Sequence, residues 1–180
     1  MTALSAQIPL GASVLDIGCG SGEIASDLAD EGRSLRGVDT LARDVCAVEM
    51  VTYDGQTLPF DDNTFEWATI IDVLHHASDP ERVLAEARRV TTAGIVLKDH
   101  FAERRRHHLT LAVMDWVGNR QFGVGRDGRY LSRDEWSEMF DSAGLNVADQ
   151  NEQIDLYPAP IKPLFESGLH FLARLEHATD

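Results

Sequence analysis

The stretch VLDIGCGSGEIA, residues 14 to 25, decides the fold of this chain. The apolar run from Val14 to Ile17 is typical of a buried strand, and apolar residues at helical spacing follow from Glu23 to Glu31. Glycine suits the turn from Gly18 to Gly22, because a tight turn needs positive φ angles and a missing Cβ lets a ligand lie against the backbone. The stretch therefore predicts a strand, a ligand-binding turn and a helix in succession.

Strands and helices continue to alternate along the rest of the chain. The run from Phe65 to Ile71 is almost entirely apolar, as in strands that are covered on both faces. Further strands are expected at residues 35–39, 49–53, 65–71, 94–98, 145–154 and 168–175, further helices at residues 80–90, 101–117 and 132–144, and loops at residues 41–48 and 120–130. This order predicts an α/β fold: a Rossmann-like, doubly wound, mostly parallel seven-stranded sheet with an antiparallel C-terminal strand.

Length and composition favour one soluble domain. The 180 residues fit a single domain, residues 1–180, and the 43% hydrophobic content is usual for a globular protein. No run approaches the roughly 18 apolar residues of a membrane span, and the start MTALSAQIPLGAS lacks the features of a signal peptide, so a cytoplasmic location without membrane contact is expected. Few residues precede the first strand, so we expect N-terminal lid helices to be largely absent.

Charge and cysteine content argue against two other classes of protein. The formal net charge of -14 repels phosphate backbones, so nucleic acid is a disfavoured partner. The basic run from Arg104 to His108 is the local exception, and such runs are usually solvated helix faces. Cys19 and Cys46 form no CxxC pair, which argues against a structural zinc site and a disulfide framework.

The spacing of the glycines distinguishes between cofactors. A dinucleotide-binding turn has the pattern GxGxxG, whereas this turn has GxGxG and places Glu23 where the third glycine would stand. A carboxylate at the start of a helix repels a pyrophosphate, although the helix N-terminus can still receive a smaller anion. A nicotinamide-dependent oxidoreductase is therefore the disfavoured alternative.

Three segments carry a family resemblance: DIGCGSG at residues 16–22, GVD at residues 37–39 and DGQTLPF at residues 54–60. With these segments the sequence resembles the class I S-adenosylmethionine-dependent methyltransferases, in particular their small type-11 group. DVLHH at residues 72–76 and the helix at residues 80–90 resemble the same group. The resemblance is strong over residues 13–100 and looser beyond them.

The resemblance implies a binding site for S-adenosylmethionine and its product S-adenosylhomocysteine. Asp39 would accept hydrogen bonds from both ribose hydroxyls, Asp54 from the adenine amino group, and Asp16 would face the methionine ammonium. An acidic pocket suits the sulfonium and ammonium cations of this ligand. The expected cofactor-binding residues are Asp16, Gly18, Cys19, Gly20, Gly22, Asp39, Thr40, Asp54, Gly55, Asp72 and Val73. Structural roles stay open for two of them, because Asp54 could begin a turn and Asp39 could cap a helix.

Catalysis would consist of an in-line methyl transfer that depends chiefly on alignment of donor and acceptor. A base is needed only if the acceptor must lose a proton, and His75, His76, Asp99 and His100 follow the expected strands where such a base would act. We choose His76 and His100 as the candidate catalytic residues. The same cluster could bind a metal ion, but no spacing of these residues along the chain demands one, so none is expected.

The acceptor is expected to be a small molecule that contacts the segment from Phe101 to Tyr130, with aromatic surface at Trp116, Phe122 and Tyr130. Without a lid, the acceptor pocket would be open, or completed by a second copy of the chain or a partner subunit. The alternative function is a catalytically inactive methyltransferase-fold subunit that binds a partner protein.

Overall fold

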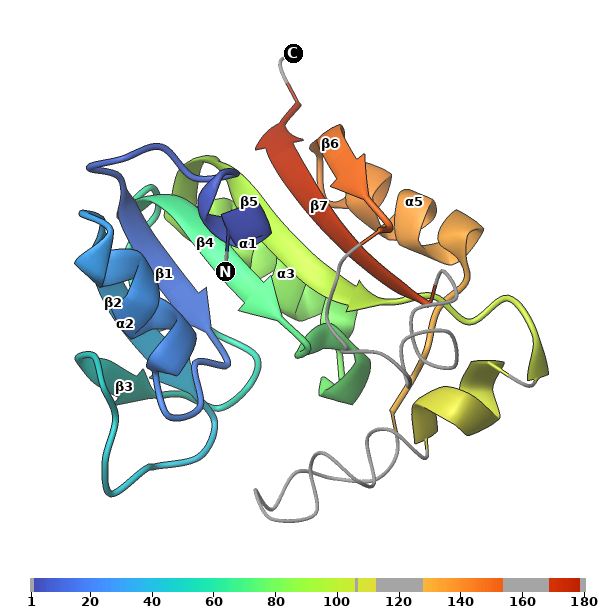
Figure 1. Ribbon diagram of the computed structural model, residues 1–180, viewed down its shortest axis with the longest axis horizontal. Coiled ribbons are helices and arrows are strands. Elements are labelled where there is room, and N and C mark those ends of the chain that lie inside the picture. Colours follow the sequence, from blue (N-terminus) through green and yellow to red (C-terminus); the bar gives the residue numbers. More distant parts are fainter. Residues whose placement is uncertain (1, 106, 113–127, 154–168, 179–180) are drawn as a thin grey trace.

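The computed structural model describes residues 2–105, 107–112, 128–153 and 169–178 (Figure 1). Its strands form one seven-stranded sheet. The strands are β1 (Ser13–Ile17), β2 (Ser34–Asp39), β3 (Met50–Thr52), β4 (Phe65–Ile71), β5 (Thr91–His100), β6 (Leu145–Asn151) and β7 (His170–His177). The helices are α1 (Thr2–Ser5), α2 (Glu23–Asp30), the 3-10 helix η1 (Leu74–His76), α3 (Pro80–Val90) and α5 (Arg133–Ser142), and residues 105 and 107–112 are also helical.

The sheet has the strand order β3-β2-β1-β4-β5-β7-β6. Strands β1 to β5 pair in parallel, and β7 runs antiparallel to both β5 and β6. The chain moves outward from β1 to β3, then returns to the other side of β1 to form β4. The predicted fold class is confirmed, and the order reverses between β1 and β4, where sheets of this kind bind ligands.

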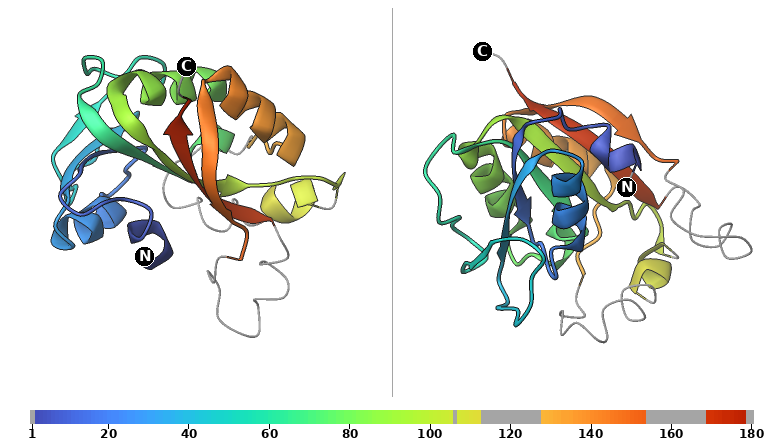
Figure 2. Two further views of the ribbon diagram at one scale, coloured as in Figure 1. Left: turned by 90° about the horizontal axis from the view of Figure 1, so that it is seen from above. Right: turned by 60° about the vertical axis from the view of Figure 1, so that its left-hand side comes forward.

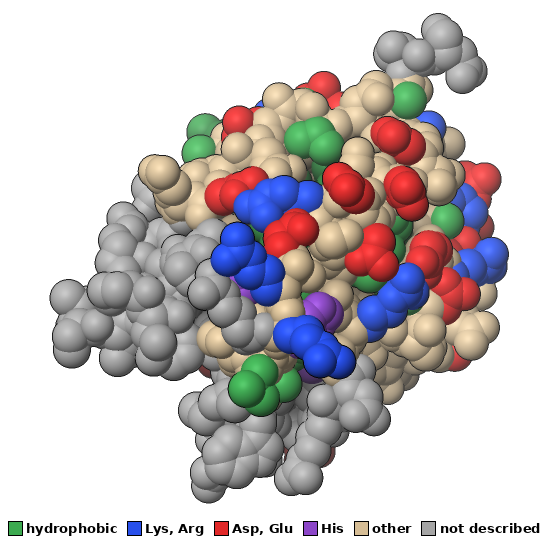
Figure 3. Space-filling view, turned by 90° about the vertical axis from the view of Figure 1, so that its right-hand side faces the viewer, with side chains coloured by type: hydrophobic (Ala, Val, Ile, Leu, Met, Phe, Trp, Pro, Cys, Tyr) green, Lys and Arg blue, Asp and Glu red, His purple; other side chains and the backbone are tan. Residues whose placement is uncertain are grey.

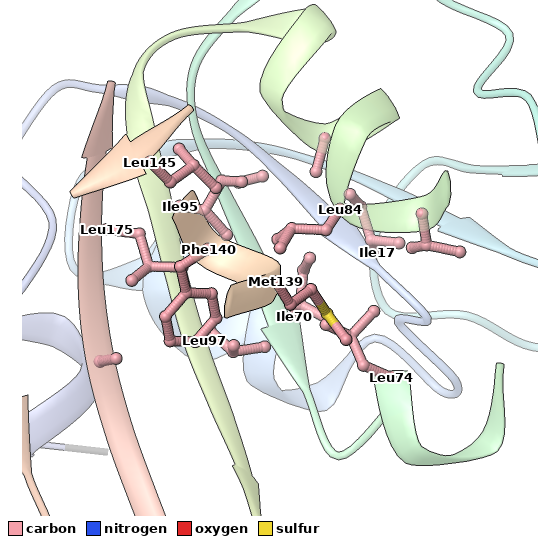
Figure 4. Close-up of a cluster of buried hydrophobic side chains, with 14 of the residues drawn as sticks. Ile17, Ile70, Leu74, Leu84, Ile95, Leu97, Met139, Phe140, Leu145 and Leu175 are labelled. Atoms are coloured by element: carbon pink, nitrogen blue, oxygen red, sulfur yellow. The ribbon is translucent and has the colours of Figure 1, made fainter. Parts of the chain in front are cut away.

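Two apolar cores lie on the two faces of the sheet. Helices α3 and α5 cover one face, and α1 and α2 cover the other (Figure 2). Because side chains alternate along a strand, Leu15 of β1 enters the core beneath α3 and α5, whereas Val14 packs with Leu28 of α2. Figure 4 shows the first core, where Met139 and Phe140 of α5 lie against apolar side chains of the strands. The sheet is thus a rigid support whose strand ends remain available for a site.

Local signals in the sequence set the ends of the helices. The Asp79 side chain accepts a hydrogen bond from the Arg82 backbone at the start of α3, and Pro80 occupies the first turn. Ser132 and Glu135 form the predicted capping box of α5. These helix starts were predicted because cap residues act within a single turn.

Two of the predicted element boundaries differ from the structure in ways that matter for the site. Strand β5 extends from Thr91 to His100 and is longer than the expected strand at residues 94–98. The expected helix at residues 101–117 does not begin at Phe101, which instead forms a β-bridge with Leu131 and stacks on Phe171. Tertiary pairing overrode the helical pattern there. The rest of that expected helix from residue 113, including Trp116, lies outside the described residues, as does Phe122.

Acidic and basic side chains are unevenly distributed on the surface. On the face that includes α5, acidic side chains gather over one part, and histidine reaches the surface between basic side chains (Figure 3).

Among the described residues, none of the helices has the length and apolar character that crossing a membrane requires.

Candidate functional site

The carboxyl ends of β1, β2 and β4 meet at one edge of the sheet, and polar residues follow each of them. Asp16 near the end of β1 is 3% exposed, and its Oδ1 accepts a 2.6 Å hydrogen bond from the hydroxyl of Thr69 on β4. This bond spans the position where the strand order reverses. Thr69 escaped the sequence analysis because it lies inside an apolar run.

We call Gly18 to Gly22 the glycine turn. All three of its glycines have positive φ angles, between 55° and 76°. A Cβ at Gly18 would overlap the side chain of Val73, whereas a Cβ at Gly20 would meet no atom within 4 Å. The backbone is therefore packed at Gly18 and open at Gly20, so Gly20 is where a ligand can approach the main chain.

Asp39 fastens the glycine turn to the end of β2. Its Oδ2 accepts a 2.8 Å hydrogen bond from the Gly20 amide, and its Oδ1 accepts one of 2.9 Å from the Leu41 amide. The amides of Gly18 and Cys19 also donate to the carbonyl of Val38. Each Asp39 oxygen keeps acceptor capacity, since a carboxylate offers about four lone-pair sites.

The turn at Asp54 lies beside this region. A Cβ at Gly55 would lie 3.3 Å from the Thr40 side chain, so the segments after β2 and β3 are neighbours. The Oδ1 of Asp54 accepts from the amides of Gln56 and Thr57, and these bonds hold the pKa of its carboxyl below the usual value. Asp54 thus begins a turn, which was the structural alternative named for it.

The glycine turn lies in a negative electrostatic environment. Burial raises the pKa of the Asp16 carboxyl to about 6, and the charge of Asp39 adds to this effect. Burial also raises the pKa of the Cys19 thiol to about 12, with further contributions from Asp16, Cys46 and Asp39. The pKa of Tyr53 rises to about 12 through burial and through Asp39 and Asp54. Such an environment favours a cationic ligand and keeps Cys19 a thiol rather than a nucleophile.

A second group of side chains lies where β4 and β5 end. We call Asp72, His75, Asp99 and His100 the histidine–aspartate cluster, because one donor atom of each lies within 4.8 Å of the others. Asp99 Oδ1 is 2.7 Å from His75 Nδ1 and 3.2 Å from His100 Nδ1. Burial alone would raise the pKa of Asp99, but hydrogen bonds from His100 and His75 outweigh it and hold this pKa far below its usual range.

Lys98 completes this part of the site and was missed by the sequence analysis. Its Nζ lies 2.5 and 2.6 Å from the two carboxylate oxygens of Asp72, whose φ of 56° is unusual for a residue other than glycine. A lysine inside the apolar run of β5 was the available signal, since a buried cation requires a partner. Asp72 is therefore paired with Lys98, and its carboxylate oxygens keep further lone pairs for another ligand.

The two predicted catalytic histidines occupy different environments. His100 is 5% exposed and its Nδ1 lies 3.6 Å from Asp72 Oδ1, whereas His76 is half-buried with its ring 4.0 Å from that of His75. The Tyr130 ring lies 5.6 Å from His75 and 6.2 Å from His100. The structure thus brings Tyr130, expected at the acceptor site, to the histidines.

Comparison with known proteins shows which family this domain is similar to. A methyltransferase domain family matches residues 15–97. The sterol 4-C-methyltransferase strm-1 of Caenorhabditis elegans is 30% identical over 125 residues, covering 57% of this chain and 37% of that protein. A ubiquinone biosynthesis O-methyltransferase of Cereibacter sphaeroides is 24% identical over 169 residues, covering 84% of this chain and 67% of that protein.

Solved structures share the whole fold. A chain in a complex that contains the Haloferax volcanii Trm112 methyltransferase activator superposes with a TM-score of 0.69 at 22% identity, covering 99% of this chain and 88% of that chain. The sheet order with an antiparallel β7 is that of the class I methyltransferase fold. Residues 15–97 of this chain thus match a methyltransferase domain family, and the whole fold is of the class I S-adenosylmethionine-dependent methyltransferase type.

The chain spans only part of some of its relatives. It covers 37% of the nematode protein and 28% of a 37.1 kDa protein from a Streptomyces fradiae transposon. The family match therefore rests on the shared domain, and that family uses S-adenosylmethionine and forms S-adenosylhomocysteine.

Proposed function

We propose that this chain binds S-adenosylmethionine across the ends of β1, β2 and β4 and transfers its methyl group to a small-molecule acceptor. The observation that carries the proposal is the Asp39 carboxylate, 7% exposed, which holds the Gly20 amide at 2.8 Å beside the open face of the glycine turn. The Asp39 carboxylate can therefore accept hydrogen bonds from the ribose of a nucleoside, while the backbone at Gly20 leaves room for the rest of the ligand.

The described residues fit this cofactor in shape and charge. Gly20 leaves room against the main chain, and Asp39 retains lone pairs for ribose hydroxyls. Asp16 would supply a carboxylate for the methionine ammonium; Cys19 lies close enough for the charge of Asp16 to affect its thiol, and Val73 packs beside Gly18. On the adenosine side, Thr40 and Gly55 adjoin each other, and Asp54 can use its second oxygen for the adenine amino group.

Bound S-adenosylmethionine supplies a methyl group activated by a sulfonium. The chain's own residues then orient the acceptor, and His76 and His100 are the groups that would accept a proton from it. The Asp99 carboxylate lies 3.2 Å from His100 Nδ1 and would orient that ring. General-base assistance of this kind is worth about 10²- to 10⁴-fold in rate when the acceptor is a weak nucleophile.

Calorimetry of the whole chain tests the proposal. We expect S-adenosylmethionine and S-adenosylhomocysteine to bind with micromolar dissociation constants, and Asp39→Ala to weaken both by more than tenfold. Asp61→Ala is the matched control, because it removes the same charge from an exposed residue outside the strand ends. Unchanged binding in Asp39→Ala would show that Asp39 does not contact the ribose. Absence of binding in the wild type would reject the proposed function.

The alternative is a methyltransferase-fold subunit that acts with a partner protein or with a second copy of the chain. The neighbour from the Trm112 complex is the observation that favours it. Sedimentation velocity of the purified chain distinguishes monomer from dimer. Measurement of S-adenosylhomocysteine formation with a panel of phenols, amines and carboxylic acids then tests for turnover by the chain alone.

A further inference from the structure

The histidine–aspartate cluster contains more ligand atoms than the proposed methyl transfer uses. Two imidazoles and two carboxylates come from three segments: the end of β4, η1 and the end of β5. His75, Asp99 and His100 are buried, and Asp72 is half-buried. Buried groups of this kind require either complete hydrogen bonding or a cation.

Hydrogen bonding at Asp99 is unbalanced. Oδ1 faces three nitrogen atoms, His75 Nδ1 at 2.7 Å, His100 Nδ1 at 3.2 Å and the His100 amide at 2.9 Å. Oδ2 is buried and has no hydrogen-bond partner among the described residues. Because an unsatisfied carboxylate oxygen is costly, Oδ2 is available for a further ligand.

The charges of the cluster point in the same direction. Asp72 and Asp99 bring two negative charges, and Lys98 supplies the compensating cation only to Asp72, through both of its oxygens. This leaves the negative charge of the fully buried Asp99 without a lysine or arginine partner among the described residues. A cation between Asp99 and the two histidines would neutralise it.

We propose that the histidine–aspartate cluster binds one divalent first-row transition-metal ion, with Asp99, His75 and His100 as ligands and Asp72 at its open side. Ligand atoms about 2.0–2.2 Å from a metal ion lie roughly 3–4 Å apart. Asp99 Oδ1 lies 2.7 Å from His75 Nδ1 and 3.2 Å from His100 Nδ1, and His100 Nδ1 lies 3.6 Å from Asp72 Oδ1, which is close to that spacing. Two imidazole nitrogens favour zinc, cobalt, iron or manganese over magnesium and calcium.

This inference revises the expectation that no metal ion would be needed, which rested on spacing along the chain. His75 and Asp99 are far apart in sequence, and only the pairing of β4 with β5 brings them together. The rings of Tyr130 and His170, 8% and 3% exposed, lie beside the cluster and limit the access of water. The site shares Asp99 and His100 with the proposed methyl transfer, but metal binding can be measured without cofactor or acceptor, so the two proposals are tested separately.

Titration with cobalt(II) tests the proposal. The whole chain is first dialysed against EDTA and then titrated with cobalt chloride in a non-chelating buffer, while the visible absorption and the heat of binding are recorded. We expect one equivalent to bind, visible bands typical of nitrogen and oxygen ligands, and a melting temperature that rises with metal. Asp99→Asn and His100→Gln should each weaken binding by more than tenfold.

Two further variants keep the test decisive. Asp72→Asn changes a half-buried residue, and we expect it to fold and to bind cobalt several-fold more weakly. His177→Gln removes a histidine at the opposite end of β7, where it contacts Thr91, and should bind as the wild type does. Absence of stoichiometric binding, or equal affinity in wild type, Asp72→Asn and His100→Gln, would overturn the proposal, whatever the outcome for S-adenosylmethionine.

Discussion

The glycine turn and the histidine–aspartate cluster lie at the same edge of one sheet but are built in opposite ways. In the glycine turn, backbone amides and positive φ angles define the shape, and Asp39 supports them from the next strand. In the cluster, side chains from separate segments define the site. A site formed by backbone groups can therefore be predicted from a short contiguous motif. A site formed by side chains from separate segments depends on how the strands pair.

Gly18→Ala should have the largest effect on stability and Gly20→Ala the sharper effect on binding. Both place an alanine at positive φ, which costs about 1–2 kcal/mol, but only Gly18→Ala also overlaps Val73, so we expect its total cost to be about 3–4 kcal/mol. Gly20→Ala should stay folded and lose S-adenosylmethionine binding by more than tenfold. Urea unfolding and calorimetry measure both effects, and equal destabilisation by the two changes would contradict this picture of the turn.

Asp16 should make stability depend on pH. Its carboxyl pKa is raised from 3.8 to about 6, so the native state holds the proton more tightly than the unfolded state does. The stabilisation is fully present below about pH 4 and is lost as pH rises through about 6, a change of about 3 kcal/mol. Asp16→Asn should therefore gain stability relative to the wild type between pH 4 and pH 8, as measured by urea unfolding.

The same carboxyl should affect cofactor affinity in the opposite sense. The ammonium of S-adenosylmethionine prefers ionised Asp16, so affinity should rise with pH through about 6 in the wild type. Asp16→Asn should flatten this dependence. If affinity depends on pH identically in the two proteins, Asp16 does not contact the ammonium of S-adenosylmethionine.

Lys98→Met tests how much the side-chain-built region depends on its ion pair. Its side chain is 11% exposed and bonded to both Asp72 oxygens, so we expect a loss of about 2 kcal/mol. A double-mutant cycle with Asp72→Asn isolates the pairwise energy. The exposed pair of Arg36 and Glu49 is the control, and Glu49→Gln should cost less than about 1 kcal/mol. Equal losses at the two pairs would contradict the importance of burial.

Cys19→Ser should have the smallest effect. Cys19 contributes its backbone amide, which donates to Val38, and its thiol pKa of about 12 leaves it unreactive near neutral pH. We expect S-adenosylmethionine affinity to change by less than about threefold, under 1 kcal/mol. A tenfold loss in calorimetry would assign the Cys19 side chain a direct part in binding.

Much of the fold followed from local signals. The buried run of β4 and the caps of α3 and α5 each lie within a few consecutive residues, so their chemistry could be read directly. The errors occurred where distant partners decide. Phe101 pairs with Leu131 and stacks on Phe171, and neither contact leaves a trace in the local pattern. The start of the expected helix was therefore wrong.

The sequence by itself determined the glycine turn and the acidic residues at the strand ends, because φ preferences, missing Cβ atoms and the succession of strands along the chain are local or periodic properties. Only the tertiary structure decided that Lys98 pairs with Asp72 and that Asp99 faces two histidines. The physical reason is that hydrogen bonds and ion pairs between side chains depend on the register of β4 against β5, which is set by packing over the whole sheet.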